Sequence, residues 1–152
     1  MTATASAVVV RPARPEDWPA IEQLLVARGL PIAGARLHLG TFLVAERAAA
    51  LVGCAGIERY GEVGLLRSVA VAGAVAGRGL GTEMVAASLE LGRRLGLQRL
   101  FLLTTNAVDY FPRFGFQSIS REALPAALAE SEELRGACPA SATPMLRLLA
   151  PR

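Results

Sequence analysis

The chain has 152 residues, 53% of them hydrophobic, which is enough to bury the core of one domain spanning residues 1–152. No apolar run approaches the length of a membrane span, and residues 1–10 have no basic region and only a very short apolar run, so we do not expect a signal peptide there. The formal charge of +3 comes from scattered arginines, because the chain has no lysine. This composition argues against membrane and nucleic-acid partners and favours contacts with small anions.

The two cysteines, Cys54 and Cys138, are too few for a disulfide framework. We therefore expect a cytoplasmic protein. Because only 19% of the residues are charged, some apolar surface should remain exposed, which favours a homodimer.

In chain order, the hydrophobic pattern predicts strands over 8–11, 41–46, 51–60, 63–71, 99–104, 116–120 and 145–149 and helices over 14–29, 80–95, 109–114 and 125–134. The segment over 32–40 is expected to form a loop or a short helix. The helix over 80–95 connects two apolar strands, and such a crossover makes these strands parallel. We predict an α/β fold with a mixed sheet of about six to seven strands flanked by helices.

The stretch over 63–82 is the centre of this prediction. Three glycines, Gly77, Gly79 and Gly81, follow an apolar strand and open a helix, a pattern that favours an anion at the helix start. A Walker loop would need a lysine after Gly81, where Thr82 stands, and Thr82 also interrupts the dinucleotide fingerprint. The pattern predicts a phosphate site of another kind.

Arg67 stands out because it is a charged residue inside the apolar strand over 63–71. Strand alternation places it on one face with Leu65 and Val69. A buried guanidinium needs an anion. Arg67 is expected either to bind the carboxylate or oxyanion of an acidic acceptor or to form an internal pair, the internal candidates being Glu46, Glu58 and Glu62.

The stretch over 76–81 reads Ala-Gly-Arg-Gly-Leu-Gly and follows Ser-Val-Ala-Val at 68–71. It resembles the pyrophosphate loop of the GNAT superfamily of acetyl-CoA-dependent N-acetyltransferases. The family pattern begins with Arg or Gln where Ala76 stands here, which predicts weaker phosphate binding unless Arg78 compensates. The resemblance implies acetyl-CoA as co-substrate, no metal, and pantetheine in a gap between splayed parallel strands.

On this basis the residues expected to bind the cofactor are Ser68, Val69, Val71, Gly77, Arg78, Gly79, Leu80, Gly81, Thr82, Thr104, Phe111 and Arg113. In the family a tyrosine usually protonates the leaving thiolate, but its position is Phe111 in this chain. Tyr110 precedes it, turned about 100° away on a helix. Tyr110 is therefore either the proton donor or a packing residue, and water or the product amine is the alternative donor.

Glu58 is the predicted general base, because it stands near the end of a strand beside the central one, next to Tyr60. The alternative is a solvated glutamate at a hairpin end. His38, the only histidine of the chain, is either a base or substrate contact or simply a structural or exposed residue. Glu62 is interpreted as a turn residue.

Four stretches, 65–71, 102–105, 110–116 and 138–142, resemble the small arsenic-resistance N-acetyltransferases, which are similar to the acetyltransferase part of N-acetylglutamate synthases. This branch implies acetylation of the α-amino group of an amino acid with a second anionic group, such as arsinothricin, phosphinothricin or glutamate. The predicted substrate-binding residues are Arg67, Tyr60, Ser141 and His38. Ser141 is equally well interpreted as a turn residue, and Cys138 alone makes a poor arsenical site.

Two alternatives remain open at this level. The acceptor could be another amine, such as a protein N-terminus or a polyamine, although a polyamine would call for an acidic pocket. The chain could also be a GNAT-fold module that binds acyl-CoA without turnover, an interpretation that Ala76 and Phe111 favour.

Overall fold

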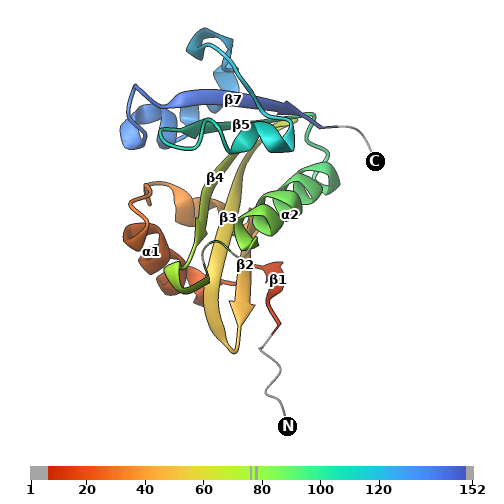
Figure 1. Cartoon of the computed structure of the whole chain (residues 1–152). Coiled ribbons are helices and arrows are strands. Elements are labelled where there is room, and N and C mark those ends of the chain that lie inside the picture. The colour runs from red at the N-terminus through yellow and green to blue at the C-terminus, as the bar shows by residue number, and fades with distance from the viewer. Residues whose placement is uncertain (1–6, 76, 78, 150–152) are drawn as a thin grey trace.

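The computed structural model describes residues 7–75, 77 and 79–149, which form a seven-stranded sheet in the order β1-β2-β3-β4-β5-β7-β6 (Figure 1). The strands are β1 (Val9–Pro12), β2 (Phe42–Arg47), β3 (Ala50–Tyr60), β4 (Val63–Val71), β5 (Arg99–Thr104), β6 (Gln117–Ser118) and β7 (Thr143–Leu148). Among the described strands, only β4 and β5 pair in parallel. The predicted mixed sheet is confirmed.

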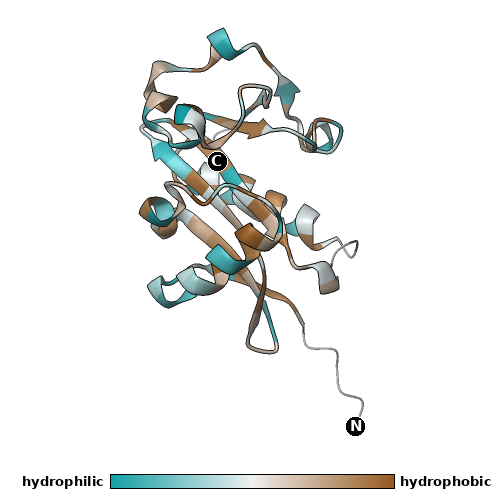
Figure 2. Ribbon diagram, turned by 90° about the vertical axis from the view of Figure 1, so that its left-hand side faces the viewer, coloured by the Kyte–Doolittle hydropathy of each residue, from teal (hydrophilic) through white to brown (hydrophobic). Residues whose placement is uncertain are grey.

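Two α-helices cover opposite faces of the sheet, α1 (Trp18–Ala27) and α2 (Leu80–Arg94) (Figure 1). Trp18, Ile21 and Leu25 of α1 pack with Phe42 and Val44 of β2. On the other face, α2 contributes buried side chains to two clusters, which also hold residues of β3, β4 and β5. The polar segments lie mainly on the outside of these layers, and the strands are mostly apolar (Figure 2).

Strand β4 does not alternate as the sequence predicts. Ser68 has a φ of 60°, and the pairing of β3 with β4 shifts register between Cys54 and Gly56. This irregularity is a β-bulge, which turns the following residues over. Val69 therefore packs on the α2 side, whereas Leu65 packs with Leu128 on the opposite side, and the prediction that Arg67 and Val69 share a face is wrong.

The parallel pair of strands separates halfway along β4. Pairing of β4 with β5 runs from Val63–Arg99 to Leu66–Leu102 and stops there, although β4 continues to Val71. The bulge at Ser68 begins within two residues of the last pair. The splayed gap expected between these strands is thus present.

After β5 the chain is less regular than the sequence predicts. The segment over 109–114 has a short turn, η4 (Phe111–Phe114), and the strand expected over 116–120 is reduced to β6. In place of one helix over 125–134, the chain forms η6 (Ala126–Glu130) and η7 (Glu133–Ala137). Other short helical turns are η1 (Pro15–Asp17), η2 (Ala35–Thr41), η3 (Gly73–Val75) and η5 (Arg121–Ala123).

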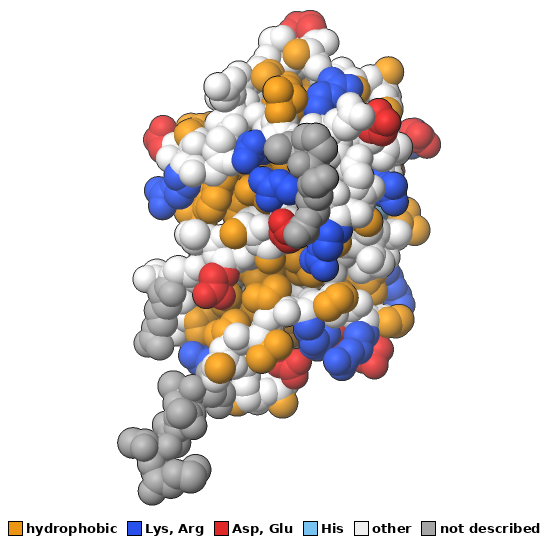
Figure 3. Space-filling view, turned by 90° about the vertical axis from the view of Figure 1, so that its right-hand side faces the viewer, with side chains coloured by type: hydrophobic (Ala, Val, Ile, Leu, Met, Phe, Trp, Pro, Cys, Tyr) orange, Lys and Arg blue, Asp and Glu red, His pale blue; other side chains and the backbone are white. Residues whose placement is uncertain are grey.

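None of the helices formed by the described residues is long and apolar enough to cross a membrane. The same residues hold no group of three or more His, Cys, Asp or Glu side chains that could bind a metal ion. On the face that carries α2, arginine side chains are dispersed among acidic and apolar ones (Figure 3).

Candidate active site

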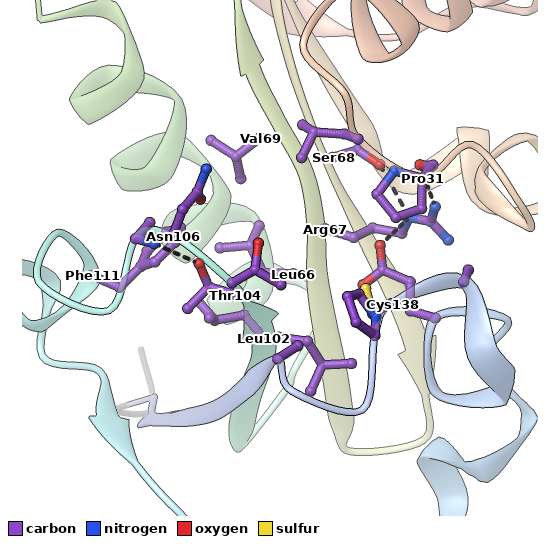
Figure 4. Close-up of a pocket in the computed structure, with 18 of the residues that line it drawn as sticks. Pro31, Leu66, Arg67, Ser68, Val69, Leu102, Thr104, Asn106, Phe111 and Cys138 are labelled. Carbon is purple, nitrogen blue, oxygen red and sulfur yellow. Dashed lines mark hydrogen bonds and ion pairs between the residues drawn. The ribbon is translucent and has the colours of Figure 1, made fainter.

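A cavity of about 510 Å³ opens where β4 and β5 separate. Its walls come from five parts of the chain: β4 at 66–69, the end of β5 with the following turn at 102–107, Tyr110 and Phe111, the loop at 29–31, and the segment over 133–142. Figure 4 shows Leu66 and Val69 on the side of β4 that faces Thr104 and Phe111, with Arg67 and Cys138 on its other side. The cavity therefore wraps around the free edge of β4.

A second cavity of about 520 Å³ adjoins the first, and four residues line both: Leu30, Val69, Asn106 and Tyr110. Its remaining walls are Arg28, Ala70, Val71, Gly77, Gly79, Gly81, Thr82 and Arg113. We refer to these two adjoining cavities together as the channel. One end of the channel lies at the turn that carries Gly77, Gly79 and Gly81, which we call the glycine-rich turn, and the other end lies beside Arg67.

The glycine-rich turn suits an anion for two reasons. Gly79 is the residue before the first turn of α2 and has a φ of 82°, a left-handed conformation that favours glycine. A Cβ at Gly81 would lie 3.3 Å from the Tyr110 hydroxyl, so a side chain there would narrow the channel. The first amides of an α-helix have no partner within the helix, and the start of α2 therefore offers donors and a positive dipole end.

The predicted cofactor residues divide between the two cavities. Ser68, Val69, Thr104 and Phe111 line the first, whereas the described glycines of the turn, together with Val69, Val71, Thr82 and Arg113, line the second. The side chain of Leu80 is buried in the core, which leaves only its backbone for a ligand. Ala76 and Arg78 lie outside the described residues.

Tyr110 points into the channel, whereas Phe111 packs in the core against Phe116. The Tyr110 hydroxyl lies 3.4 Å from Thr82 Oγ1, at the start of α2. The Arg113 guanidinium lies 4.6 Å from the centre of the Tyr110 ring. Tyr110 thus borders the channel near the glycine-rich turn, and its role as thiolate donor stays a prediction.

Arg67 is enclosed and lies in a dense network. Its Nη1 donates to Glu58 Oε2 at 2.6 Å and to the Ala33 carbonyl at 2.8 Å, and its Nη2 donates to the Pro31 carbonyl at 3.1 Å. Its Nε donates to Ser68 Oγ at 3.0 Å and lies 3.4 Å from Glu133 Oε2. The internal pair with Glu58, one of the alternatives open from the sequence, is present.

Glu58 lies behind Arg67 and is fully buried. Its Oε1 accepts a hydrogen bond of 2.6 Å from the Tyr60 hydroxyl, and His38 Nε2 lies 3.8 Å from the same oxygen. Burial lowers the pKa of His38 and, together with the Glu58 contact, raises the pKa of Tyr60. Glu58, Tyr60 and His38 are not among the residues that line the two cavities, and their predicted roles stay predictions.

Glu133, at the start of η7, was not a candidate from the sequence. It is 4% exposed, lines the first cavity and faces Arg67. Burial raises its pKa to about 6 against the opposing effect of Arg67. Nothing in the local sequence separates Glu133 from its exposed neighbour Glu132, so only the path of the chain after β6 brings it to the site.

The segment from η7 to β7 closes one side of the first cavity. Cys138 and Pro139 line it, and Arg121 holds this segment by donating to the carbonyls of Pro139 at 3.1 Å and Ala142 at 3.3 Å. Burial, reinforced by Glu133, raises the pKa of the Cys138 thiol to about 12. Ser141 is exposed in a turn and does not line the cavity, although Ala142 does.

Sequence reasoning also missed Arg28 and Asn106. Arg28 follows α1 and lines the second cavity, which the glycine-rich turn also lines, and Asn106 lines both cavities. The splayed strands, the glycine-rich turn at a helix start and the adjoining channel match the geometry that the GNAT resemblance implies. Residues 8–116 also match the Acetyltransferase (GNAT) family. The chain belongs to the GNAT acetyltransferase family.

Its relatives within this family include amino-acid acetyltransferases. The amino-acid acetyltransferase of Mycobacterium tuberculosis is 36% identical over 123 residues, which are 73% of this chain and 69% of the relative. That of Neisseria meningitidis serogroup A is 32% identical over 90 residues, or 58% of this chain and 21% of the relative. The GNAT chain thus matches about a fifth of the length of the Neisseria relative.

A solved structure adds a ligand-bound comparison. N-acetylglutamate synthase from Neisseria gonorrhoeae, complexed with coenzyme A and N-acetyl-glutamate, superimposes with a TM-score of 0.80 at 27% identity. The match covers 95% of this chain and 36% of the synthase.

Proposed function

We propose that the protein transfers the acetyl group of acetyl-CoA to the α-amino group of a small anionic amino acid, with glutamate, phosphinothricin and arsinothricin as the acceptor class. The observation that carries the proposal is the first cavity, which opens at the gap between β4 and β5 and has one arginine, Arg67, and one glutamate, Glu133, among its lining residues. An α-amino acid is a zwitterion and needs both charges. The amino-acid acetyltransferases among its relatives support the same class.

Acetyl-CoA is proposed to lie along the channel. Its phosphates are proposed to bind at the start of α2 and the glycine-rich turn, with Arg28 and Arg113 supplying positive charge in place of the side chain that Ala76 lacks. Pantetheine then follows the free edge of β4 at 68–71, where the splay leaves backbone groups without a partner on β5. Acetyl-CoA supplies a thioester, which is already a competent electrophile.

The residues of this chain then have to orient the amine and accept its proton. Arg67 is proposed to bind the acceptor carboxylate. A guanidinium has five N–H donors, and the described contacts use one on Nε, two on Nη1 and one on Nη2. One Nη2 hydrogen has no partner among these contacts, but the Arg67 side chain has no exposed surface, so a direct contact with the acceptor requires a local shift of the loop at Pro31. Tyr110 or water is proposed to protonate the thiolate.

The test is release of free thiol from acetyl-CoA over a panel of glutamate, phosphinothricin, arsinothricin, spermidine and a peptide N-terminus. We expect turnover with the acidic amino acids only. Arg67→Lys keeps the positive charge but loses the planar arrangement of N–H donors of the guanidinium. The KM for the acidic acceptor should therefore rise about tenfold, while the KM for acetyl-CoA stays unchanged. Arg59→Lys, an exposed arginine on β3, is the matched control.

Preferential turnover of spermidine or the peptide would reject the acceptor class. No turnover with any amine, combined with tight binding of acetyl-CoA, would replace the proposal by a binding module.

The predicted cytoplasmic location and homodimer belong to the same proposal. Light scattering tests the dimer.

A further inference from the structure

The described lining of the channel holds a single carboxylate, that of Glu133. The backbone fixes its position from both sides. The Glu133 amide donates to Ser131 Oγ at 3.2 Å, and the Glu133 carbonyl accepts from the Cys138 amide at 3.1 Å. Arg67 Nε, 3.4 Å from Glu133 Oε2, holds the carboxylate at the side of the cavity that adjoins β4.

The other candidate bases are less well placed. Glu58 is fully buried behind Arg67 and already accepts hydrogen bonds from Arg67 and Tyr60 at 2.6 Å each. His38 lies beyond Glu58 and borders neither cavity. Cys138 does line the first cavity, but a thiol with a raised pKa of about 12 stays protonated and cannot accept a proton near neutral pH.

We propose that Glu133 is the catalytic residue that accepts the proton of the acceptor's ammonium group, and that Glu58 acts as a positioning residue for Arg67. This inference rests on the proposed function. It assigns the two buried carboxylates around Arg67 to different tasks. The one that faces the cavity takes part in the reaction, and the one behind the guanidinium holds it in place.

The charges around Glu133 suit this task. Burial raises its pKa to about 6, Glu58 on β3 acts in the same direction, and Arg67 on β4 and the Cys138 thiol oppose them. The carboxyl is therefore ionised at neutral pH and remains a better proton acceptor than an exposed glutamate, whose pKa is about 4.3. Two carboxylates against one guanidinium also leave a net negative charge, which attracts an ammonium ion.

The protons balance over one turnover. The ammonium gives one proton to Glu133, and the free amine attacks the thioester carbonyl, so that the C–N bond forms. When the tetrahedral intermediate collapses, the C–S bond breaks, and the second proton of the nitrogen goes to the thiolate. The third stays on the amide, and Glu133 returns its proton to water.

The experiment is the pH profile of kcat/KM for thiol release with the acidic acceptor that the wild type prefers. For the wild type, kcat/KM should fall as the pH drops below about 6, and we call this fall the acid limb of the profile. Glu133→Gln should lose about a hundredfold at pH 7 together with this limb, in line with the usual contribution of a general base. Glu133→Asp should restore the limb at a reduced rate.

Two further variants separate this role from a structural one. Glu132→Gln alters the exposed neighbour and should match the wild type. Glu58→Gln should raise the KM for the acceptor but retain the acid limb. Acetyl-CoA affinity and the melting temperature of Glu133→Gln, measured in parallel, show that the variant is folded and binds the cofactor.

The outcomes are distinguishable. If the wild type is active and Glu133→Gln keeps both the acid limb and a rate within about threefold of the wild-type rate, the role of Glu133 as the base is overturned. The proposed function would then still stand. Loss of the limb in Glu58→Gln instead would assign the base to Glu58. A wild type that releases no thiol with any acidic amino acid would overturn the proposed function, and this inference with it.

Discussion

The two ends of the channel are built in different ways. The cofactor end comes largely from one continuous stretch, the end of β4, the glycine-rich turn and the start of α2. The acceptor end is assembled from segments far apart in the sequence: Pro31 from the loop after α1, Arg67 from β4 and Glu133 from η7. The first end offers mainly backbone groups, and the second depends on side-chain charges.

This contrast has an energetic consequence. Backbone amides at a helix start remain in place when most side chains change, so the cofactor end should be sensitive mainly to its glycines. A buried network of one guanidinium and two carboxylates is destabilised when any member is removed. The acceptor end should therefore respond strongly to single charge changes.

The largest expected effect is on stability at the acceptor end. Arg67→Met leaves the carboxylates of Glu58 and Glu133 buried without their cation, which should lower the free energy of unfolding by about 3–5 kcal/mol. Urea denaturation measures this loss. The double variant Arg67→Met/Glu58→Gln should recover part of it, and a double variant no more stable than the single one would argue against the network.

The next effect is the pH dependence caused by Glu133. Its pKa is raised from 4.5 to about 6 in the folded chain, so its stabilising contribution is complete below pH 4.5 and is lost as the pH rises through 6. Relative to the wild type, Glu133→Gln should gain about 2 kcal/mol of unfolding free energy between pH 4 and pH 7. A difference that does not change with pH would contradict the raised pKa.

At the cofactor end, Gly79→Val should weaken acetyl-CoA binding about tenfold or more. The left-handed conformation at Gly79, with its φ of 82°, is strained for a β-branched residue, so the first turn of α2 should shift. Calorimetric titration with acetyl-CoA measures the effect. Gly40→Ala, at a site with open space and an ordinary φ, is the matched control and should bind normally.

The smallest effects are expected for the arginines of the second cavity. Arg28→Ala and Arg113→Ala should each raise the Kd for acetyl-CoA about two- to fivefold, because exposed charge contacts contribute little and are screened by salt. Arg59→Ala should have no effect, because Arg59 pairs with Gly64 at the start of β4, whereas the second cavity lies at the end of that strand. If both losses persist unchanged in 1 M salt, the contacts are not electrostatic.

The cofactor end of the channel could be predicted from the sequence better than the acceptor end. The strand, turn and helix over 63–95 are local patterns, and the pairing of β4 with β5 follows from the crossover. The bulge at Ser68 has no such pattern, so strand alternation gave the wrong face for Val69. Residues 125–134 contain helix-favouring residues, yet the backbone becomes extended at Ser131 and the segment forms two short turns, the second of which brings Glu133 to Arg67.

Among the site residues, Arg67 was found because a charge within an apolar strand is conspicuous. Glu133 was not found, because a glutamate in a polar segment is common and its partner Arg67 lies far away in the sequence. Arg28 was missed for a similar reason, since only the packing of α1 brings it to the cavity that the glycine-rich turn also lines.

The central claim is that one continuous channel holds both substrates, with the reacting atoms at the edge of β4. The most direct test is the affinity of a bisubstrate compound in which the sulfur of CoA is linked through an acetyl bridge to the α-nitrogen of glutamate. We predict that it binds at least about tenfold tighter than CoA, because one molecule then gains the contacts of both ends. Equal affinities for the bisubstrate compound and CoA would place the acceptor elsewhere and contradict the account.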